Sequence, residues 1–207
     1  MPLLLASASP RRQELLKNAA IDFVVRPANI PEVRRAGEAP KTFAERMAQE
    51  KARAVFAGKN GEYVLGADTV VAVEPGNDGA VAGGATGLPP VELQLVLGKP
   101  ESPEDAARML RLLSGRKHHV ITGVCLIGNN FEDVRSESTT VHFSHVSEAD
   151  ISDYIASGEP MDKAGAYAIQ GAASRWISKI EGDYSNVVGL PVALVLQMLR
   201  EHQLSGS

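Results

Sequence analysis

The segment Tyr63–Val73 constrains the fold of this chain more than any other part of the sequence. It is almost continuously apolar, which is typical of a strand covered on both faces of a sheet. Around it, predicted strands and helices alternate early in the chain, and strands cluster later. The pattern predicts an α/β fold: a mixed β-sheet flanked by helices.

One carboxylate, Asp68, interrupts this apolar strand. Burying a carboxylate there costs several kcal/mol unless it is paired, bound to a metal or exposed at the end of the strand. Gly66 and Ala67 precede it and leave room for another group to approach closely. Asp68 is therefore a candidate catalytic or metal-binding residue, or else an aspartate held by backbone N–H groups or by one arginine. Thr69 is expected on the opposite face of the strand.

The N-terminal segment Leu3–Arg12 combines a short apolar strand with a helix start rich in positive charge. Two arginines, Arg11 and Arg12, fall in the first helical turn, where the helix dipole disfavours cations. With free backbone N–H groups and the hydroxyls of Ser7 and Ser9, they would make a phosphate receptor. The alternative is that both arginines are solvated surface residues.

Three lysines stand where a predicted element meets a turn or an apolar stripe. Lys51 lies beside the apolar face of a helix predicted over Phe43–Ala57, Lys99 lies in a Gly-Lys-Pro turn, and Lys163 begins a segment rich in glycine and alanine. Each lysine alone reads as a solvated side chain. If they converge with the two arginines, they could neutralise a triphosphate.

The length of 207 residues suits one domain, residues 1–207, or two lobes of that domain around a central cleft. Residues 75–90 are rich in Gly, Ala and Pro and predict a flexible insertion.

Thr42 and Glu45 form a capping-box pattern at the start of the helix predicted over Phe43–Ala57. The other predicted strands are Asp22–Arg26, Leu93–Leu97, Val120–Ile127, Ser138–Phe143, Ala164–Gln170 and Trp176–Ile180. The other predicted helices begin at Ser102 and Ser147, with a last one over Val192–His202.

Bulk properties exclude several classes of function. The net charge of -4 gives no general attraction for nucleic acids or anionic membranes. The single cysteine, Cys125, excludes a disulfide framework and reads as a buried thiol. No apolar run is long enough to span a bilayer, and the N-terminus does not resemble a signal peptide. We therefore expect a cytoplasmic protein with no nucleic-acid or membrane partner.

Several familiar catalytic motifs are missing. Gly98-Lys99 lacks the other residues of a P-loop, and there is no Gly-x-Ser-x-Gly elbow. The paired histidines are spaced so that they point to opposite faces of strands, which argues against a histidine-bound metal. Carboxylate binding of Mg²⁺ or Mn²⁺ by Glu32 and Asp68, completed by substrate phosphates, suits the chain better.

These residues resemble the Maf family of nucleotide pyrophosphatases over nearly the whole chain. The resemblance is carried by five segments in order, and a sixth match follows at Val187–Pro191. The first and fifth segments are the most specific. The five are Leu5–Arg12, Glu50–Ala52, Gly66–Val71, Gly98–Pro100 and Asp162–Gly171.

The resemblance implies an enzyme that cleaves nucleoside triphosphates to the monophosphate and pyrophosphate. It also implies a divalent metal, a fold similar to that of the inosine triphosphate pyrophosphatases, and Asp68 as general base. A homodimer is plausible on the same ground. The triphosphate would then be held by the basic set Arg11, Arg12, Lys51, Lys99 and Lys163.

Three positions resemble those that separate branches of the family: Arg11, Thr69 and Gln170. This set resembles the branch that acts on dTTP and UTP, whereas the 7-methyl-GTP branch tends to have tryptophan, glutamine and glutamate. A side-chain amide at Gln170 offers a donor and an acceptor, which matches the imide edge of uracil or thymine.

Two departures from the family pattern are visible. The region near Asn77–Pro90 is longer than the expected hairpin, and Pro31 precedes Glu32 where an acidic residue is more usual.

Two other functions remain open from the sequence alone. One is a pyrophosphatase for other nucleotides, such as 7-methyl-GTP or ITP. The other is a nucleotide-binding regulator of cell division without turnover, since the family is associated with septum formation.

Overall fold

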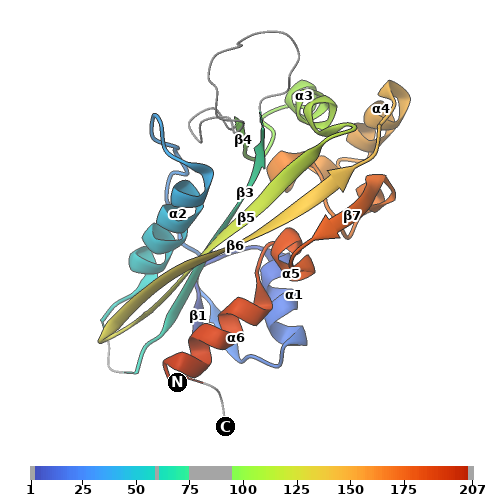
Figure 1. Ribbon diagram of the computed structural model, residues 1–207. Helices are drawn as coiled ribbons and strands as arrows, with labels where there is room; N and C mark the ends of the chain where they lie inside the picture. The colour runs from blue at the N-terminus through green and yellow to red at the C-terminus, as the bar shows by residue number, and fades with distance from the viewer. Residues whose placement is uncertain (1–2, 59–60, 75–94, 205–207) are drawn as a thin grey trace, which may run out of the picture.

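The computed structural model describes residues 3–58, 61–74 and 95–204. These residues form a mixed β-sheet flanked by helices (Figure 1), so the predicted α/β fold is confirmed. The predicted insertion at residues 75–90 lies outside the described residues. The division of the chain into two lobes stays a prediction.

The sheet formed by the described residues has seven strands in the order β2-β1-β3-β5-β6-β7, with β4 paired to β3. The strands are β1 (Leu3–Leu5), β2 (Phe23–Val25), β3 (Val64–Val73), β4 (Leu95–Leu97), β5 (Lys117–Gly128), β6 (Phe131–Phe143) and β7 (Ile177–Glu181). The α-helices are α1 (Pro10–Asn18), α2 (Pro40–Val55), α3 (Pro103–Leu113), α4 (Glu148–Ala156), α5 (Tyr184–Val188) and α6 (Val192–Glu201). Short 3-10 helices are η2 (Glu159–Asp162), η3 (Ala164–Ala166) and η4 (Ala172–Trp176).

Strand β3 lies at the centre of the sheet and leaves part of one edge open. Its full-length partner on one side is the antiparallel strand β5. On the other side, the parallel strand β1 pairs only with Val64 and Leu65, and the antiparallel strand β4 pairs only with Val71–Val73. Among the residues that the structure describes, no strand lies beside the β3 residues between these two contacts, which have Asp68 in their middle.

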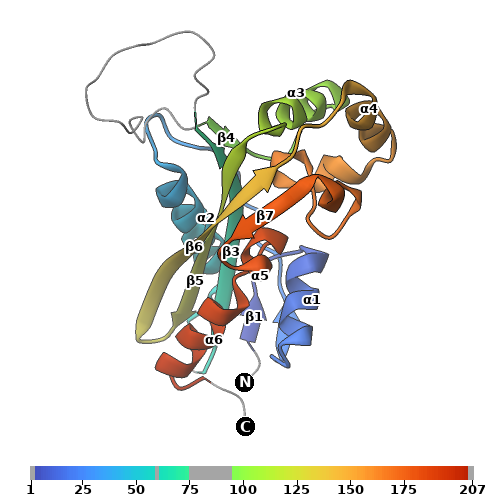
Figure 2. The ribbon, with the colours of Figure 1, turned by 45° about the vertical axis from the view of Figure 1, so that its right-hand side comes forward.

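Helix α2 covers one face of the sheet, with the other helices placed on the opposite face and at its upper end (Figures 1 and 2). Two glycines let α2 approach closely. A Cβ on Gly66 would lie 2.2 Å from the carbonyl oxygen of Ala48, and one on Gly123 would lie 2.3 Å from that of Ala44. Because Gly123 pairs with Asp68, α2 runs directly over the candidate catalytic residue.

The opposite face of β3 contacts helices from both ends of the chain. Leu65 packs in one cluster with Leu16 of α1 and Met198 of α6. Farther along the strand, Val71 joins a second core that includes Leu110 of α3. Alternation along the strand therefore sends even-numbered side chains, including Asp68, toward α2 and odd-numbered ones away from it.

Three local expectations differ from the structure. Helix α2 begins at Pro40 with no side-chain cap, so the proposed capping box is not used; proline at the first helical position starts the helix instead. The segment 164–170 is not a strand, because Gly165 and Ala166 adopt positive φ values of 70° and 59°. Strand β6 begins at Phe131 rather than near Ser138, because its polar first half pairs with β5 in a long hairpin.

The single cysteine and the helices can be compared with the predictions made from composition. Cys125 is buried and free, and burial raises the pKa of its thiol to about 12, so it is an unreactive core residue. Among the described residues, no helix combines the length and apolar character that crossing a membrane requires.

Candidate active site

The open edge of β3 borders a cleft with a volume of about 440 Å³. The strands β1 and β4 pair with β3 on either side of Asp68, and residues of the segments that follow them line the cleft together with residues of the 163–170 segment. Every residue that the sequence predicted as part of the site lines this cleft. They are Ser7, Ser9, Arg11, Arg12, Glu32, Lys51, Asp68, Thr69, Lys99, Lys163 and Gln170.

At the floor of the cleft, the ammonium group of Lys51 joins two carboxylates. Its Nζ atom lies 2.5 Å from Oδ1 of Asp68 and 2.6 Å from Oε1 of Glu32. The side chains of Lys51 and Asp68 are only 9% and 8% exposed, whereas that of Glu32 is 44% exposed. Lys51 reaches this position from α2 because Gly66 and Gly123 allow that helix to lie against the sheet.

Burial sets the protonation behaviour of this group. It raises the pKa of the Asp68 carboxyl above its usual value, and the ammonium of Lys51 and the guanidinium of Arg12 offset part of that rise. Burial also acts to raise the pKa of Glu32, but the hydrogen bond and charge of Lys51, with Lys99 and Arg12, bring it below its usual value. A buried carboxylate with a raised pKa at the floor of a cleft is a candidate general base.

Arg12 is buried and tied into the chain on three sides. Its Nε donates to the carbonyl oxygen of Gly189 at 2.8 Å, Nη1 to Oγ of Ser7 at 3.1 Å, and Nη2 to Oγ1 of Thr69 at 3.0 Å. Burial lowers its pKa from the usual arginine value, with Asp68 acting in the opposite direction. A guanidinium has five N–H donors, so two remain for a ligand. Arg12 also holds α1 against β3 and the end of α5.

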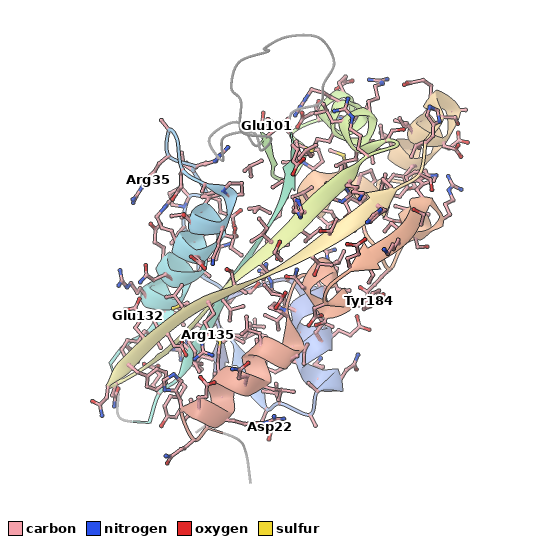
Figure 3. The ribbon with its side chains drawn as sticks, viewed as in Figure 1. Asp22, Arg35, Glu101, Glu132, Arg135 and Tyr184 are labelled. Carbon is pink, nitrogen blue, oxygen red and sulfur yellow. The ribbon has the colours of Figure 1, made fainter. Side chains whose placement is uncertain are left out.

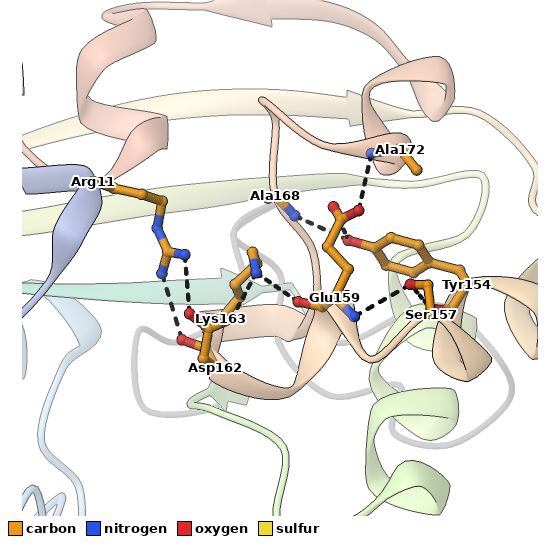
Figure 4. Close-up of polar contacts among 8 residues, drawn as sticks. All are labelled: Arg11, Tyr154, Ser157, Glu159, Asp162, Lys163, Ala168 and Ala172. Carbon is orange, nitrogen blue, oxygen red and sulfur yellow. Dashed lines mark hydrogen bonds and ion pairs between the residues drawn. The ribbon is translucent and has the colours of Figure 1, made fainter. Parts of the chain in front are cut away.

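At the rim of the cleft, Arg11 and Lys163 share one partner, Asp162 (Figure 4). Nη1 of Arg11 lies 3.1 Å from one carboxylate oxygen of Asp162, and Nζ of Lys163 lies 2.6 Å from the other. Lys163 also donates to the carbonyl oxygen of Glu159 at 2.5 Å. Partial burial alone would raise the pKa of Asp162, but the hydrogen bonds from Lys163 and Arg11 lower it overall.

Two further predicted residues, Lys99 and Gln170, are exposed and line the cleft from opposite segments. Lys99 follows β4, and its charge contributes to lowering the pKa of Glu32. The carbonyl oxygen of Gly98 accepts a hydrogen bond from the backbone N–H of Gly165 at 3.0 Å. This bond ties the segment that carries Lys99 to the segment that carries Lys163 and Gln170.

Sequence reasoning missed several residues that shape the site. Asp162 was identified only as part of a motif, although an acid next to Lys163 was a visible signal. The carbonyl oxygen of Gly189 accepts from both Arg12 and Thr69, at 2.8 and 3.3 Å, and no sequence pattern announces a main-chain contact of this kind. Tyr167 also lines the cleft, and its hydroxyl shares a hydrogen bond of 2.7 Å with Nε2 of buried His118.

Glu32 and Asp68 are the residues of this site that fit a divalent cation. One oxygen of each carboxylate is paired with the ammonium nitrogen of Lys51, so a cation would be held through the second oxygen of each. Within the described ranges, no group of three or more His, Cys, Asp or Glu side chains is arranged to hold a metal. Two carboxylates completed by substrate phosphates and water form the kind of set that Mg²⁺ favours.

A buried carboxylate below several cations, at the open edge of an α/β sheet, suits an enzyme that acts on polyphosphate anions. Comparison with known proteins agrees with this class. The family model described as "Maf-like protein" matches residues 2–202, so this chain belongs to the Maf family.

Relatives with assigned names are similar along almost the whole chain. A dTTP/UTP pyrophosphatase of Koribacter versatilis (strain Ellin345) is 52% identical over 200 residues, which cover 97% of this chain and 94% of the relative. Proteins with the same name from Symbiobacterium thermophilum and from Geobacillus sp. (strain WCH70) are 46% and 42% identical. These matches cover 96% of this chain in both cases, and 93% and 96% of the relatives.

Proposed function

We propose that this protein hydrolyses dTTP and UTP to the nucleoside monophosphate and pyrophosphate. The single observation that carries the proposal is the buried Asp68–Lys51 pair at the floor of a cleft whose rim holds Arg11, Lys99 and Lys163. The names of the relatives support the choice of nucleotide. The residues Arg11, Thr69 and Gln170, which resemble the dTTP/UTP branch, all line the same cleft.

In this proposal, the basic residues bind the triphosphate and Asp68 accepts a proton from water. The oxygen of that water forms a bond to the α-phosphorus, and the bond from the α-phosphorus to the bridging oxygen breaks. Pyrophosphate leaves with the electron pair, and cations close to it stabilise its charge. The α-phosphate would lie nearest to Asp68, and the leaving group would lie toward the rim.

In the alternative to Asp68 as the base, Glu32 and Asp68 would together hold a divalent cation, Mg²⁺ or Mn²⁺. When bound, such an ion supplies positive charge that polarises phosphate oxygens. The ammonium of Lys51 lies between the two carboxylates, where it binds both and offsets the repulsion between their negative charges. Its ammonium would also be within the part of the cleft that the phosphates occupy.

The negative carboxylate of Asp162 would compete with the substrate for Arg11 and Lys163. Its side chain is 63% exposed, so it can leave these cations with little loss of packing. A bound phosphate would offer the same two side chains a more highly charged partner. This exchange favours binding of a triphosphate over binding of a monophosphate, which supports release of the product.

A turnover panel tests the proposal. The purified full chain is assayed with dTTP, UTP, CTP, 7-methyl-GTP and ITP, with Mg²⁺ or Mn²⁺, and both products are measured. We expect dTTP and UTP to have the highest kcat/KM. Preference for 7-methyl-GTP or ITP would reject the nucleotide assignment, and intact UTP in every condition would favour a binding protein without turnover.

The assignment of Gln170 has its own test. Gln170→Glu removes the amide donor and adds an acceptor, so kcat/KM for UTP and dTTP should fall relative to the other nucleotides of the panel. A variant with an unchanged substrate profile would show that Gln170 does not read the base.

A further inference from the structure

The segment Ala168–Ala172, which carries Gln170, is held from below by two side chains (Figure 4). The hydroxyl of Tyr154, in α4, accepts a hydrogen bond from the backbone N–H of Ala168 at 3.3 Å. One carboxylate oxygen of Glu159 accepts from the backbone N–H of Ala172, also at 3.3 Å. The points of attachment therefore lie two residues before and two residues after Gln170.

Tyr154 and Glu159 are also joined to each other, so the segment has one shared support. The Tyr154 hydroxyl donates to Oε1 of Glu159 at 2.9 Å. Ser157 reinforces the connection, since its hydroxyl donates to the carbonyl oxygen of Tyr154 at 2.6 Å and accepts from the backbone N–H of Glu159 at 3.2 Å. We call the two side chains of Tyr154 and Glu159 the clamp.

The clamp itself is anchored in the core. Tyr154 is 2% exposed, and its ring packs edge-on against Trp176 with the ring centroids 5.1 Å apart. The carbonyl oxygen of Glu159 holds the ammonium of Lys163 at 2.5 Å. The same short stretch of chain thus fixes the position of a cation at the rim and of the segment that carries Gln170.

Gly171 makes room for the clamp. A Cβ at this position would lie 1.7 Å from Oε1 of Glu159 and 2.5 Å from its Cδ, so only glycine lets the carboxylate reach its place. The backbone N–H of Gly171 donates to the carbonyl oxygen of Ala168 at 3.2 Å, which closes a tight turn around Gln170. A methyl group here would displace the end of a flexible side chain rather than the backbone.

We propose that Tyr154 and Glu159 are positioning residues for selection of the base, acting through the backbone on either side of Gln170. This inference rests on the proposed function and adds to it the device that sets nucleotide specificity. Gln170 is exposed and has a flexible side chain, so it discriminates between hydrogen-bonding edges only if its backbone is held still. Neither clamp residue lines the cleft, so neither contacts the substrate in this proposal.

Two variants break the clamp from different sides. Tyr154→Phe removes the hydroxyl and keeps the buried ring, and Gly171→Ala expels the carboxylate of Glu159. Tyr184→Phe is the matched control, because Tyr184 is 48% exposed at the start of α5 and its side chain lies outside the cleft (Figure 3). The measurement is kcat and KM for UTP and for CTP, together with the thermal midpoint of each variant.

For both clamp variants, we expect kcat for UTP within about twofold of the unmodified chain and KM raised about five- to tenfold, as loss of a buried hydrogen bond implies. The ratio of kcat/KM for UTP to that for CTP should fall by a similar factor. Tyr184→Phe should change none of these values. If Tyr154→Phe does not fold, Gly171→Ala carries the test alone.

Two results would overturn the inference, and they have different meanings. A lower thermal midpoint with an unchanged UTP-to-CTP ratio would show that the clamp is only structural, while the proposed function stands. No preference for UTP over CTP in the unmodified chain would reject the proposed nucleotide assignment itself, and the role of the clamp with it.

Discussion

The floor and the rim of the cleft hold their charges in different ways. At the floor, Lys51 and Asp68 are less than one tenth exposed and belong to a helix and a strand that pack closely. At the rim, Arg11 and Asp162 are 28% and 63% exposed, and Asp162 is the last residue of the short 3-10 helix η2. Removing one partner of a buried pair leaves an uncompensated charge, whereas an exposed pair contributes little.

The difference assigns separate tasks to the two regions. The floor keeps a base and its counter-ion in one geometry, which suits the reacting bond. The rim can exchange an internal carboxylate for a substrate phosphate, which suits binding and release. The predictions below test whether chemistry is confined to the floor and binding to the rim.

The largest effect is expected from Asp68→Asn. The amide keeps an oxygen for the Lys51 ammonium but does not accept a proton, so kcat should fall about 10²- to 10⁴-fold. Pyrophosphate release from UTP measures the loss, and circular dichroism with a thermal scan checks that the variant folds. A folded variant with near-normal activity would exclude Asp68 as the base.

The second prediction concerns the close contact between α2 and β3, which brings Lys51 to the floor of the cleft. Gly66→Ala places a methyl group 2.2 Å from the carbonyl oxygen of Ala48, so α2 has to move away from β3. The free energy of unfolding should fall by about 1–3 kcal/mol, measured by urea denaturation. Gly98→Ala is the control, because a Cβ there meets nothing within 4 Å. Equal effects of the two variants would contradict this account.

The third prediction is a pH dependence that originates at the floor. Asp68 acts as a base only when ionised, and burial raises its pKa, so kcat/KM should fall as the pH falls through that raised value. The loss should approach tenfold per pH unit and begin above the ordinary aspartate range near about 4. An acidic limb at or below the ordinary value would contradict a raised pKa in the free enzyme.

The smallest effect is expected at the rim. Arg11→Ala removes one partly exposed partner of Asp162, so KM for UTP should rise roughly fivefold while kcat and the thermal midpoint change little. Because Arg11 is one of the residues that resemble the dTTP/UTP branch, the nucleotide preference should also shift. Arg111→Ala, which breaks an exposed pair with Glu148 outside the cleft lining, is the control. A large loss of kcat in Arg11→Ala would erase the distinction between floor and rim.

Some of the fold could be predicted from the sequence because it depends on local pattern. The continuous apolar run of β3 predicted a strand covered on both faces, and Ser102 and Ser147 predicted the caps of α3 and α4, where each accepts from the third residue after it. The prediction of a strand over 164–170 was wrong, because Gly165 and Ala166 adopt positive φ values where Gly165 lies close against Val71, a contact that no local pattern indicates.

The residues of the candidate site also fall into those that a local pattern predicted and those that it did not. The sequence identified an acid inside an apolar strand and five cations at turns and helix starts, because each is unusual in its local setting. It did not identify Tyr154, Glu159 or the carbonyl oxygen of Gly189, because their contacts join segments whose approach no local pattern describes.

The sequence by itself determined which groups carry charge and most of the segments that form strands and helices, since hydrophobic spacing and capping act over a few residues. Only the tertiary structure decided that β1 and β4 leave the middle of β3 open, and that two glycines bring Lys51 against Asp68. The physical reason is that the energy of a buried charge depends on the partners around it, and those partners come from distant parts of the chain.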